Sequence, residues 1–278
     1  WGDNARGAVA IVCGVALLGT SWRARGADER GRAQTVVAAT GLLFLTVAVP
    51  IVLRNEWVTI IWALEAAALA ALRVRVPHRG LLVASTIVAA AVLLRLLANP
   101  EVLDYHPRTG TPIFNWWLYG YGLPAASLLV AWDRLRRDDE AKRAHLPPLF
   151  AAAGGVVLFA LVNLEIADLY STGSRVSLEL TGGGFQKDMT YTLAWGVFAL
   201  ALFGVGMAGG SRGARIGAIV LVCVTVAKGA LHDVWALGAL YRVGAIVGLA
   251  ATLLAVSYLT QRFVLQGGPR PPPRQPPP

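Results

Sequence analysis

Long apolar blocks recur along almost the whole chain, and they restrict its fold more than any other feature. The blocks run for roughly 16 to 22 residues, about the length that a helix needs to cross ~30 Å of hydrocarbon. Apolar residues make up 56% of the 278 residues and charged residues only 15%, a balance that would leave a soluble protein covered in exposed hydrocarbon. The sequence therefore predicts an all-α protein, a polytopic bundle of transmembrane helices.

We expect about nine helices, one for each block, with polar interruptions in two of them leaving the count open by one. The predicted spans are residues 7–21, 35–53, 57–73, 81–97, 113–132, 149–169, 189–209, 215–234 and 243–261. The chain begins at Trp1 without a methionine or the basic segment of a signal peptide. We therefore expect it to lack a signal peptide and to be a piece of a longer protein.

The distribution of basic residues predicts how the helices are oriented. Alternate connections, together with the carboxyl-terminal tail, carry 17 of the 25 Lys and Arg, whereas the opposite connections carry 5. Because Lys and Arg are retained on the cytoplasmic side, the first helix should start outside and the carboxyl terminus should be cytoplasmic. The basic clusters lie between apolar blocks and not on one soluble face, so the formal charge of +9 is interpreted as membrane orientation, with no nucleic-acid partner.

A set of residues recurs at a fixed offset of 133, which indicates an internal repeat. Thr59, Trp62, Ala66, Ala68, Leu69, Arg79, Gly80 and Arg95 match Thr192, Trp195, Ala199, Ala201, Leu202, Arg212, Gly213 and Lys228. At an offset of 126, Gly122, Leu123, Ala125 and Ala126 match Gly248, Leu249, Ala251 and Thr252.

These matches predict two parallel four-helix units, because an even number of crossings keeps both units in the same orientation. The predicted domains are 1–34, the last helix of an upstream unit and a cytoplasmic loop; 35–143, the first unit; 144–263, the second unit; and 264–278, a Pro-rich cytoplasmic tail.

Polar residues inside the spans are costly in hydrocarbon and are therefore candidate functional residues. Glu65 is predicted to lie near mid-membrane, either hydrogen-bonded to a neighbouring helix or serving as a proton site. The others gather near the outer helix ends: Arg95, Asn99, Asn115, Asn163, Glu165, Asp168, Lys228, His232, Asp233 and Arg242. Either they form interhelical pairs that hold the bundle together, or they line an outward-facing pocket for a lipid headgroup, a sugar phosphate or an ion.

Motifs of known chemistry are lacking in the sequence. The run TGGG at 181–184 lacks the lysine of a phosphate loop, and neither a GxSxG nor an HExxH pattern occurs. Cys13 and Cys223 lie inside apolar blocks, where cysteine usually packs as a small hydrophobe, so we expect no metal and no cofactor. The tail GGPRPPPRQPPP is predicted to be extended polyproline II, either solvated or bound by an aromatic groove of a partner.

Four segments within roughly residues 35–263 carry a family resemblance: WVTIIWALEAAAL from Trp57, YTLAW from Tyr191, VTVAKGALHDV from Val224 and YRVGAIVGLAATLLAVSYLTQRF from Tyr241. They resemble the carboxyl-terminal part of bacterial multi-pass proteins grouped as domain of unknown function 2339. The resemblance implies a bacterial inner-membrane protein, usually much longer, with many helices and no established activity. The run AKGALHDV is less bulky between Lys228 and Asp233 than the resemblance leads us to expect.

Three functions fit these observations. The first is a scaffold or envelope-biogenesis component built from repeated units, with the lipid bilayer, a lipid or glycolipid and a partner for the tail as its contacts. The second is a carrier or flippase for an anionic or lipid-linked substrate, although no span pair broken at mid-membrane by proline or glycine supports it. The third is an enzyme acting at the outer face on a lipid-linked substrate, with Asp168, His232 or Asp233 as acid or base.

Overall fold

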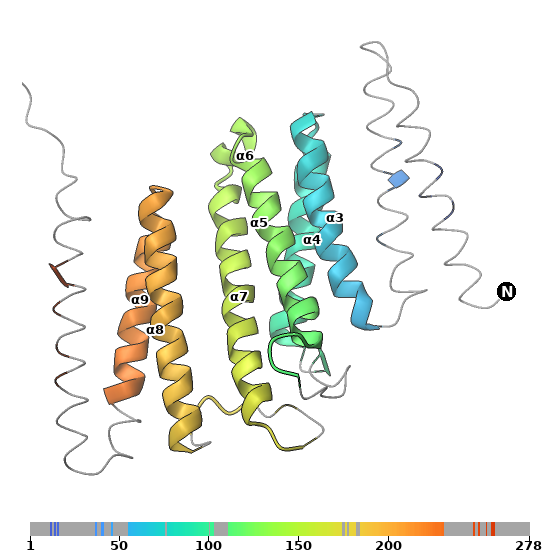
Figure 1. Cartoon of the computed structure of the whole chain (residues 1–278). Coiled ribbons are helices and arrows are strands. Elements are labelled where there is room, and N and C mark those ends of the chain that lie inside the picture. Colours follow the sequence, from blue (N-terminus) through green and yellow to red (C-terminus); the bar gives the residue numbers. More distant parts are fainter. Residues whose placement is uncertain are drawn as a thin grey trace, which may run out of the picture. The chain divides into compact units, whose positions relative to one another are not determined.

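The computed structural model describes residues 55–75, 77–99, 101–102, 111–173, 176, 178–181 and 184–230, with a few single positions nearer the two ends (Figure 1). Within these residues the chain is helical and contains no strand. The elements are α3 (Asn55–Arg75), α4 (Arg79–Ala98), the π-helix η2 (Leu118–Gly122), α5 (Leu123–Leu135), α6 (Asp139–Arg143), α7 (Leu146–Tyr170), α8 (Phe185–Ala208) and α9 (Arg212–Lys228). The predicted spans 7–21, 35–53 and 243–261 lie outside the described residues except at single positions.

Four of these helices are long and apolar enough to cross a membrane. They are Trp57–Arg75, Arg79–Ala98, Leu146–Tyr170 and Phe185–Ala208, with mean hydropathies between 1.6 and 2.4. Their ends agree within four residues with the predicted spans 57–73, 81–97, 149–169 and 189–209. The all-helical class and the presence of transmembrane helices are thus confirmed, while the count of nine and the repeat stay predictions.

The fifth predicted span, 113–132, differs from an unbroken α-helix. A π-helical turn covers Leu118–Gly122, and regular α-helix resumes at Leu123. Pro124 has no amide hydrogen, so it cannot donate to the Gly120 carbonyl as an ordinary residue would, and the turn before it widens. Sequence periodicity does not reveal such a change of hydrogen-bonding pattern.

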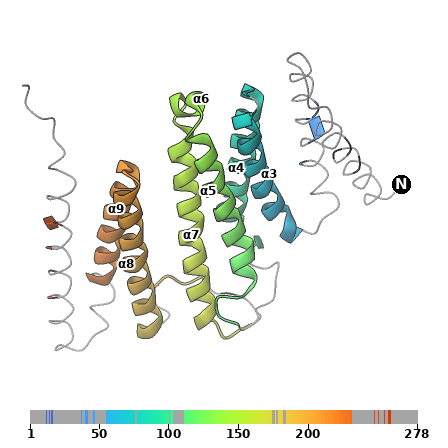
Figure 2. The same cartoon turned by 45° about the horizontal axis from the view of Figure 1, so that its top comes forward.

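The chain divides into two compact units, Trp1–Glu179 and Leu180–Pro278. In the first, α3 packs against both α4 and α5, and α5 packs against α7 (Figures 1 and 2). Its core is rich in small residues, and Ala66, Ala70, Ala125 and Ala131 are fully buried. Small side chains let helix backbones approach closely, which is how helices gain packing energy in lipid.

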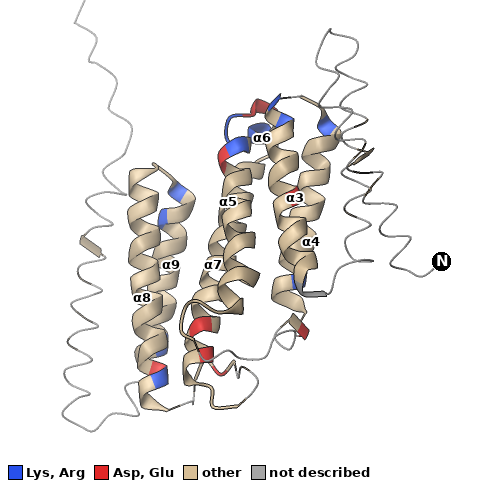
Figure 3. Cartoon of the chain, turned by 45° about the vertical axis from the view of Figure 1, so that its right-hand side comes forward, with Lys and Arg blue, Asp and Glu red and all other residues tan. Residues whose placement is uncertain are grey.

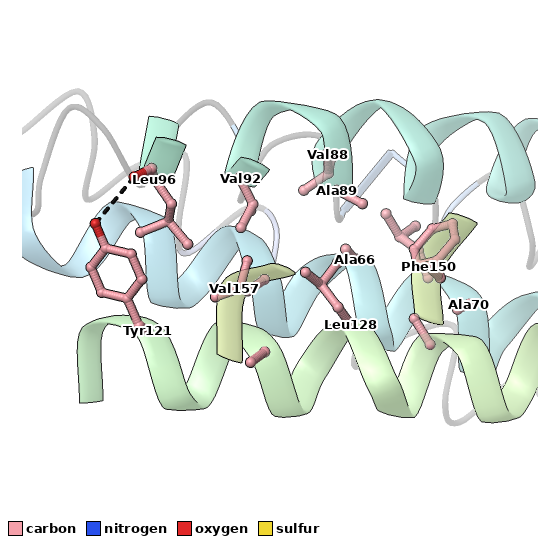
Figure 4. Close-up of a cluster of buried hydrophobic side chains, with 14 of the residues drawn as sticks. Ala66, Ala70, Val88, Ala89, Val92, Leu96, Tyr121, Leu128, Phe150 and Val157 are labelled. Carbon is pink, nitrogen blue, oxygen red and sulfur yellow. Dashed lines mark hydrogen bonds between the residues drawn. The ribbon is translucent and has the colours of Figure 1, made fainter. Parts of the chain in front are cut away.

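Larger side chains fill the space between these close-packed helices. Figure 4 shows Leu128 of α5 beside Ala66 of α3 in the buried cluster, and both side chains are 0% exposed. A Cβ added at Gly154 of α7 would lie 2.9 Å from the Leu129 side chain, which marks the close contact between α5 and α7. The first unit therefore has a continuous packed interior.

The second unit contains the hairpin of α8 and α9, which pack along each other. The two helices are closest near their connection, where a Cβ added at Gly206 would lie 2.9 Å from the backbone nitrogen of Arg215. Ser211 caps α9 by accepting a hydrogen bond of 3.3 Å from the Ala214 amide. Glycine at position 206 is what permits this tight reversal.

Candidate functional site

A buried ion-pair network joins the end of α3 to the connection between α5 and α7. Arg73, 4% exposed, donates to Asp138 from Nε at 2.9 Å and to Glu140 from Nη2 at 2.7 Å. Arg79, at the start of α4, lies 2.5 Å from the other oxygen of Glu140. Figure 3 shows these charges gathered at one end of the helices of the first unit. The network ties α3, α4 and α6 together.

Asp138 carries two structural roles within this network. Its carboxylate also accepts a hydrogen bond of 2.8 Å from the Ala141 amide and so caps α6. Partial burial works against ionisation of this carboxyl, but the hydrogen bonds from Ala141 and Arg73 outweigh it and hold its pKa below the usual value. Asp138 is therefore a charged partner for Arg73 at neutral pH.

At the opposite end of the helices, Asn115 and Glu165 join the start of the fifth span to α7. The Asn115 amide donates to Glu165 Oε2 at 2.8 Å, and its oxygen accepts from the Trp117 amide at 2.9 Å. The amide of Ile113 also donates to Glu165 Oε2, at 3.2 Å. Ile113 has φ of 68°, a left-handed conformation rare for a β-branched residue, which this hydrogen bond helps to hold.

The α3–α4 hairpin and the α8–α9 hairpin each contain a cation bonded to a threonine of the neighbouring helix. Arg95 Nε, on α4, donates to the hydroxyl of Thr59 on α3 at 3.0 Å. Lys228 Nζ, at the end of α9, donates to the hydroxyl of Thr192 on α8 at 3.0 Å and to the Asp188 carbonyl at 3.1 Å. These bonds connect the last turn of the second helix to the beginning of the first.

Two more predicted residues bond to nearby backbone, and a third, Asp168, lies close to Glu165 on α7. Asn99 ends α4, and its side chain accepts from the Glu101 amide at 3.0 Å. Asn163 is buried and donates to the Phe159 carbonyl at 2.7 Å, one turn earlier on α7. Asp168 lies one turn beyond Glu165 on the same helix and is 4% exposed. The described bonds of Asn99 and Asn163 are structural.

Glu65, which the sequence predicts near mid-membrane, lies at the middle of α3 and is 6% exposed. One carboxylate oxygen accepts a hydrogen bond from the hydroxyl of Thr46, whose carbonyl in turn accepts from the Trp62 indole nitrogen at 3.3 Å. The other oxygen, Oε2, is buried and has no hydrogen-bond partner among the described residues. The bond to Thr46 is the kind of link to a neighbouring segment expected of a structural carboxylate.

An open pocket of about 340 Å³ lies on the surface of the α3–α4 hairpin. Apolar atoms form most of its lining, and the lining residues are Trp62, Ala91, Leu94, Arg95, Ala98 and Asn99. It brings together two of the predicted candidates, Arg95 and Asn99. A cation beside an indole and aliphatic groups provides an environment for an amphipathic ligand with a negative group.

His232, Asp233 and Arg242 lie outside the described residues, so their grouping with Lys228 stays a prediction. Sequence reasoning missed Arg73 and Asp138 as partners, because Arg73 was interpreted only as an orientation signal. The run Asp138, Asp139 and Glu140, acidic within an otherwise basic connection, is the signal that could have revealed them.

The fold and the site define an integral membrane protein of the polytopic helical class: four described helices are of membrane length, and charged residues gather at the helix ends. The family model for predicted membrane proteins, domain of unknown function 2339, matches residues 76–263, and the chain belongs to this family. No curated protein and no solved structure matches the chain. The match confirms the resemblance, although it begins after the segment WVTIIWALEAAAL.

Proposed function

We propose that this chain is a membrane scaffold, an envelope-biogenesis component of the bacterial inner membrane with its carboxyl terminus in the cytoplasm. The observation that carries this proposal is that described polar side chains join helices to one another. Arg73 binds Asp138 and Glu140, Asn115 binds Glu165, and each of these bonds links residues at least 50 positions apart. Side chains used in this way hold helices together, which is the first requirement of a scaffold.

Two similar hairpins support the repeat within this scaffold. The first helix of each hairpin ends at Arg75 in α3 and at Ala208 in α8. The second begins at Arg79 in α4 and at Arg212 in α9, so the end of the first helix and the start of the second each recur after 133 residues. At the same offset, the bond from Arg95 to Thr59 recurs as that from Lys228 to Thr192, both at 3.0 Å. We propose that α3–α4 and α8–α9 are copies of one hairpin within two parallel four-helix units.

Reconstitution into lipid vesicles separates a scaffold from a flippase. The full chain is placed in vesicles that contain fluorescent phosphatidylglycerol, and dithionite is added to bleach the outer leaflet. Because a scaffold provides no path for headgroups, we expect the bleached fraction to equal that of protein-free vesicles. Faster or more complete bleaching that is lost in Arg95→Gln would overturn the scaffold and favour the carrier.

Complementation tests the role of Glu65. In a strain that lacks the gene, we expect Glu65→Gln to restore growth and envelope integrity in proportion to its amount in the membrane, because glutamine keeps an oxygen that accepts from Thr46. Loss of complementation with a normal amount of folded protein would instead assign Glu65 a proton role.

Binding of an anionic lipid is a second candidate function, favoured by the pocket beside Trp62 and Arg95. A basic residue near anionic headgroups contributes about 1 kcal/mol, so Arg95→Gln should weaken binding of phosphatidylglycerol about fivefold. Native mass spectrometry of the protein with phosphatidylglycerol and with phosphatidylcholine measures this difference. Arg75→Gln, an exposed cation at the other end of the hairpin, is the matched control, and equal losses in both variants would contradict a site at this pocket.

A further inference from the structure

A sharp apolar turn lies shortly before η2, and two of its side chains are open. Ile113 and Phe114 are 60% and 77% exposed, whereas the next residue, Asn115, is buried. The Phe114 amide donates to the Pro112 carbonyl at 2.7 Å, and Ile113 between them has φ of 68°. Such a bond across three residues, with a positive φ at the centre, is the rare and strained form of γ-turn. The backbone thus bends where two large apolar side chains lie outside the packed core.

The contact between this turn and α7 indicates its depth in the membrane. The Ile113 amide donates to Glu165 Oε2, and Glu165 lies one and a half turns before the end of α7 at Tyr170. With 25 residues, α7 is about 37 Å long and exceeds the ~30 Å of hydrocarbon by about 4 Å at each end when it is centred. Glu165 lies about 7.5 Å from the end of the helix, so the turn is level with the edge of the hydrocarbon.

Two tryptophans give the same depth independently of helix length. Trp57, at the start of the first described span, and Trp116, two residues after Phe114, contact each other edge to face with ring centroids 5.6 Å apart. Tryptophan is enriched where hydrocarbon meets headgroups, because its ring is apolar and its N–H is a donor. Trp57 is 46% exposed, so it can occupy that boundary, with the apolar turn close beside it.

The protein itself supplies hydrogen-bond acceptors to backbone amides of this irregular segment. Glu165 accepts from the Ile113 amide. The side-chain oxygen of Asn115 accepts from the amides of Trp117 and Leu118 at 2.9 Å and 3.3 Å. A loop in water needs no such acceptors, because water provides them, whereas irregular backbone at membrane depth must be satisfied internally. Asn115 and Glu165 thus act as positioning residues for the turn.

We propose that residues 112–114 form an interfacial anchor, which inserts Ile113 and Phe114 between headgroups and acyl chains at the end of the helices opposite Arg73. Depth and satisfied amides identify lipid as the occupant of this apolar surface. A water-soluble partner would meet the protein beyond the headgroups, and the turn does not extend that far. Because interfacial anchors help to set the tilt of membrane helices, the anchor holds the first unit at one depth. This role is independent of the scaffold function.

Spin-label accessibility in vesicles measures this depth on the full chain. In a background with Cys13 and Cys223 replaced by serine, Phe114→Cys carries a nitroxide, and the protein is placed in vesicles of phosphatidylethanolamine and phosphatidylglycerol. Oxygen concentrates in hydrocarbon and a nickel chelate stays in water, so the ratio of their collision rates with the label reports depth. We expect a ratio several times that at Lys142→Cys, an exposed position of α6, and below that at Ile87→Cys, an exposed position in the middle of α4.

Two substitutions of Glu165 test how the turn is held. Glu165→Gln keeps an acceptor for the Ile113 amide and should leave the ratio unchanged, whereas Glu165→Leu removes it and should shift the ratio towards that at Lys142→Cys. An unchanged ratio in Glu165→Leu would contradict the positioning role.

A ratio at position 114 equal to that at Lys142→Cys overturns the anchor. Low collision rates with both reagents do so as well, because they show that protein and not lipid covers the turn. If Phe114→Cys lowers the amount of folded protein, the label at Ile113→Cys measures the same turn and is judged by the same comparison.

Discussion

Arg73→Ala is expected to destabilise the folded protein by about 3–5 kcal/mol, the usual cost of breaking a buried ion pair from one side. Arg73 is 4% exposed, and its removal leaves the largely buried Asp138 without its cationic partner, while Glu140 keeps only Arg79. The loss should appear as unfolding at a much lower fraction of SDS in mixed micelles, followed by tryptophan fluorescence.

Arg136→Ala is the control for this substitution. Arg136 is also paired with an aspartate, Asp133 at 2.6 Å, but its side chain is 52% exposed, so water screens the pair and its loss should cost about 1 kcal/mol or less. Equal effects of the two substitutions would contradict the structural role of the buried network.

Acidification gives an independent check on the same network. Because the pKa of Asp138 is lowered in the folded protein, its charge stabilises the fold at pH values above its usual pKa of 3.8. This stabilisation should disappear as the pH falls below that value and through the lower pKa of the folded state. In Arg73→Ala the pH dependence in this acid range should be smaller, since one cause of the lowered pKa is gone.

Leu128→Ala is expected to destabilise the first unit by about 2 kcal/mol, the low end of the range for core leucines. The side chain is completely buried, at 0% exposed, and lies beside Ala66 (Figure 4). The removed atoms leave a cavity, but the unfolded helix still lies in hydrocarbon, so the water-transfer part of the cost is absent.

Leu64→Ala is the control, because it shortens a leucine that is not packed in the core. Leu64 is on α3 and is 51% exposed. Its truncation mainly removes contacts with lipid, so the unfolding midpoint in SDS should change little. If the two substitutions had equal effects, the packed cluster around Leu128 would not be what stabilises the first unit.

Helix positions could be predicted from sequence because they depend on a strong and local signal, the length of each apolar block. The span 81–97 agrees with α4, Arg79–Ala98, since the charged residues Arg79 and Arg95 lie at its ends. The π-helical turn at Leu118–Gly122 could not be predicted, because it depends on one missing amide in Pro124 and on the packing around it.

Partners across the bundle were harder to predict than the residues themselves. Position along each predicted span singled out Glu65 and Asn115 as polar groups within the spans, and both are buried in the structure. It did not say that Asn115 binds Glu165, or that Thr59 binds Arg95, because these contacts depend on which helix faces meet. Apolar residues are spread nearly evenly around membrane helices, so their spacing carries little information about which faces meet.

The partners of Arg73 also bear on the order in which the protein is made. Asp138 and Glu140 follow Arg73 by 65 and 67 residues, so at about 5–20 residues per second the ribosome needs roughly 3–13 s to deliver them. Until then Arg73 lies beside Arg75 in the last turn of α3 without these acidic partners. The acidic connection arrives later and binds this side chain, so the contact that joins α3 to α6 can form only after residues 138–140 have been made.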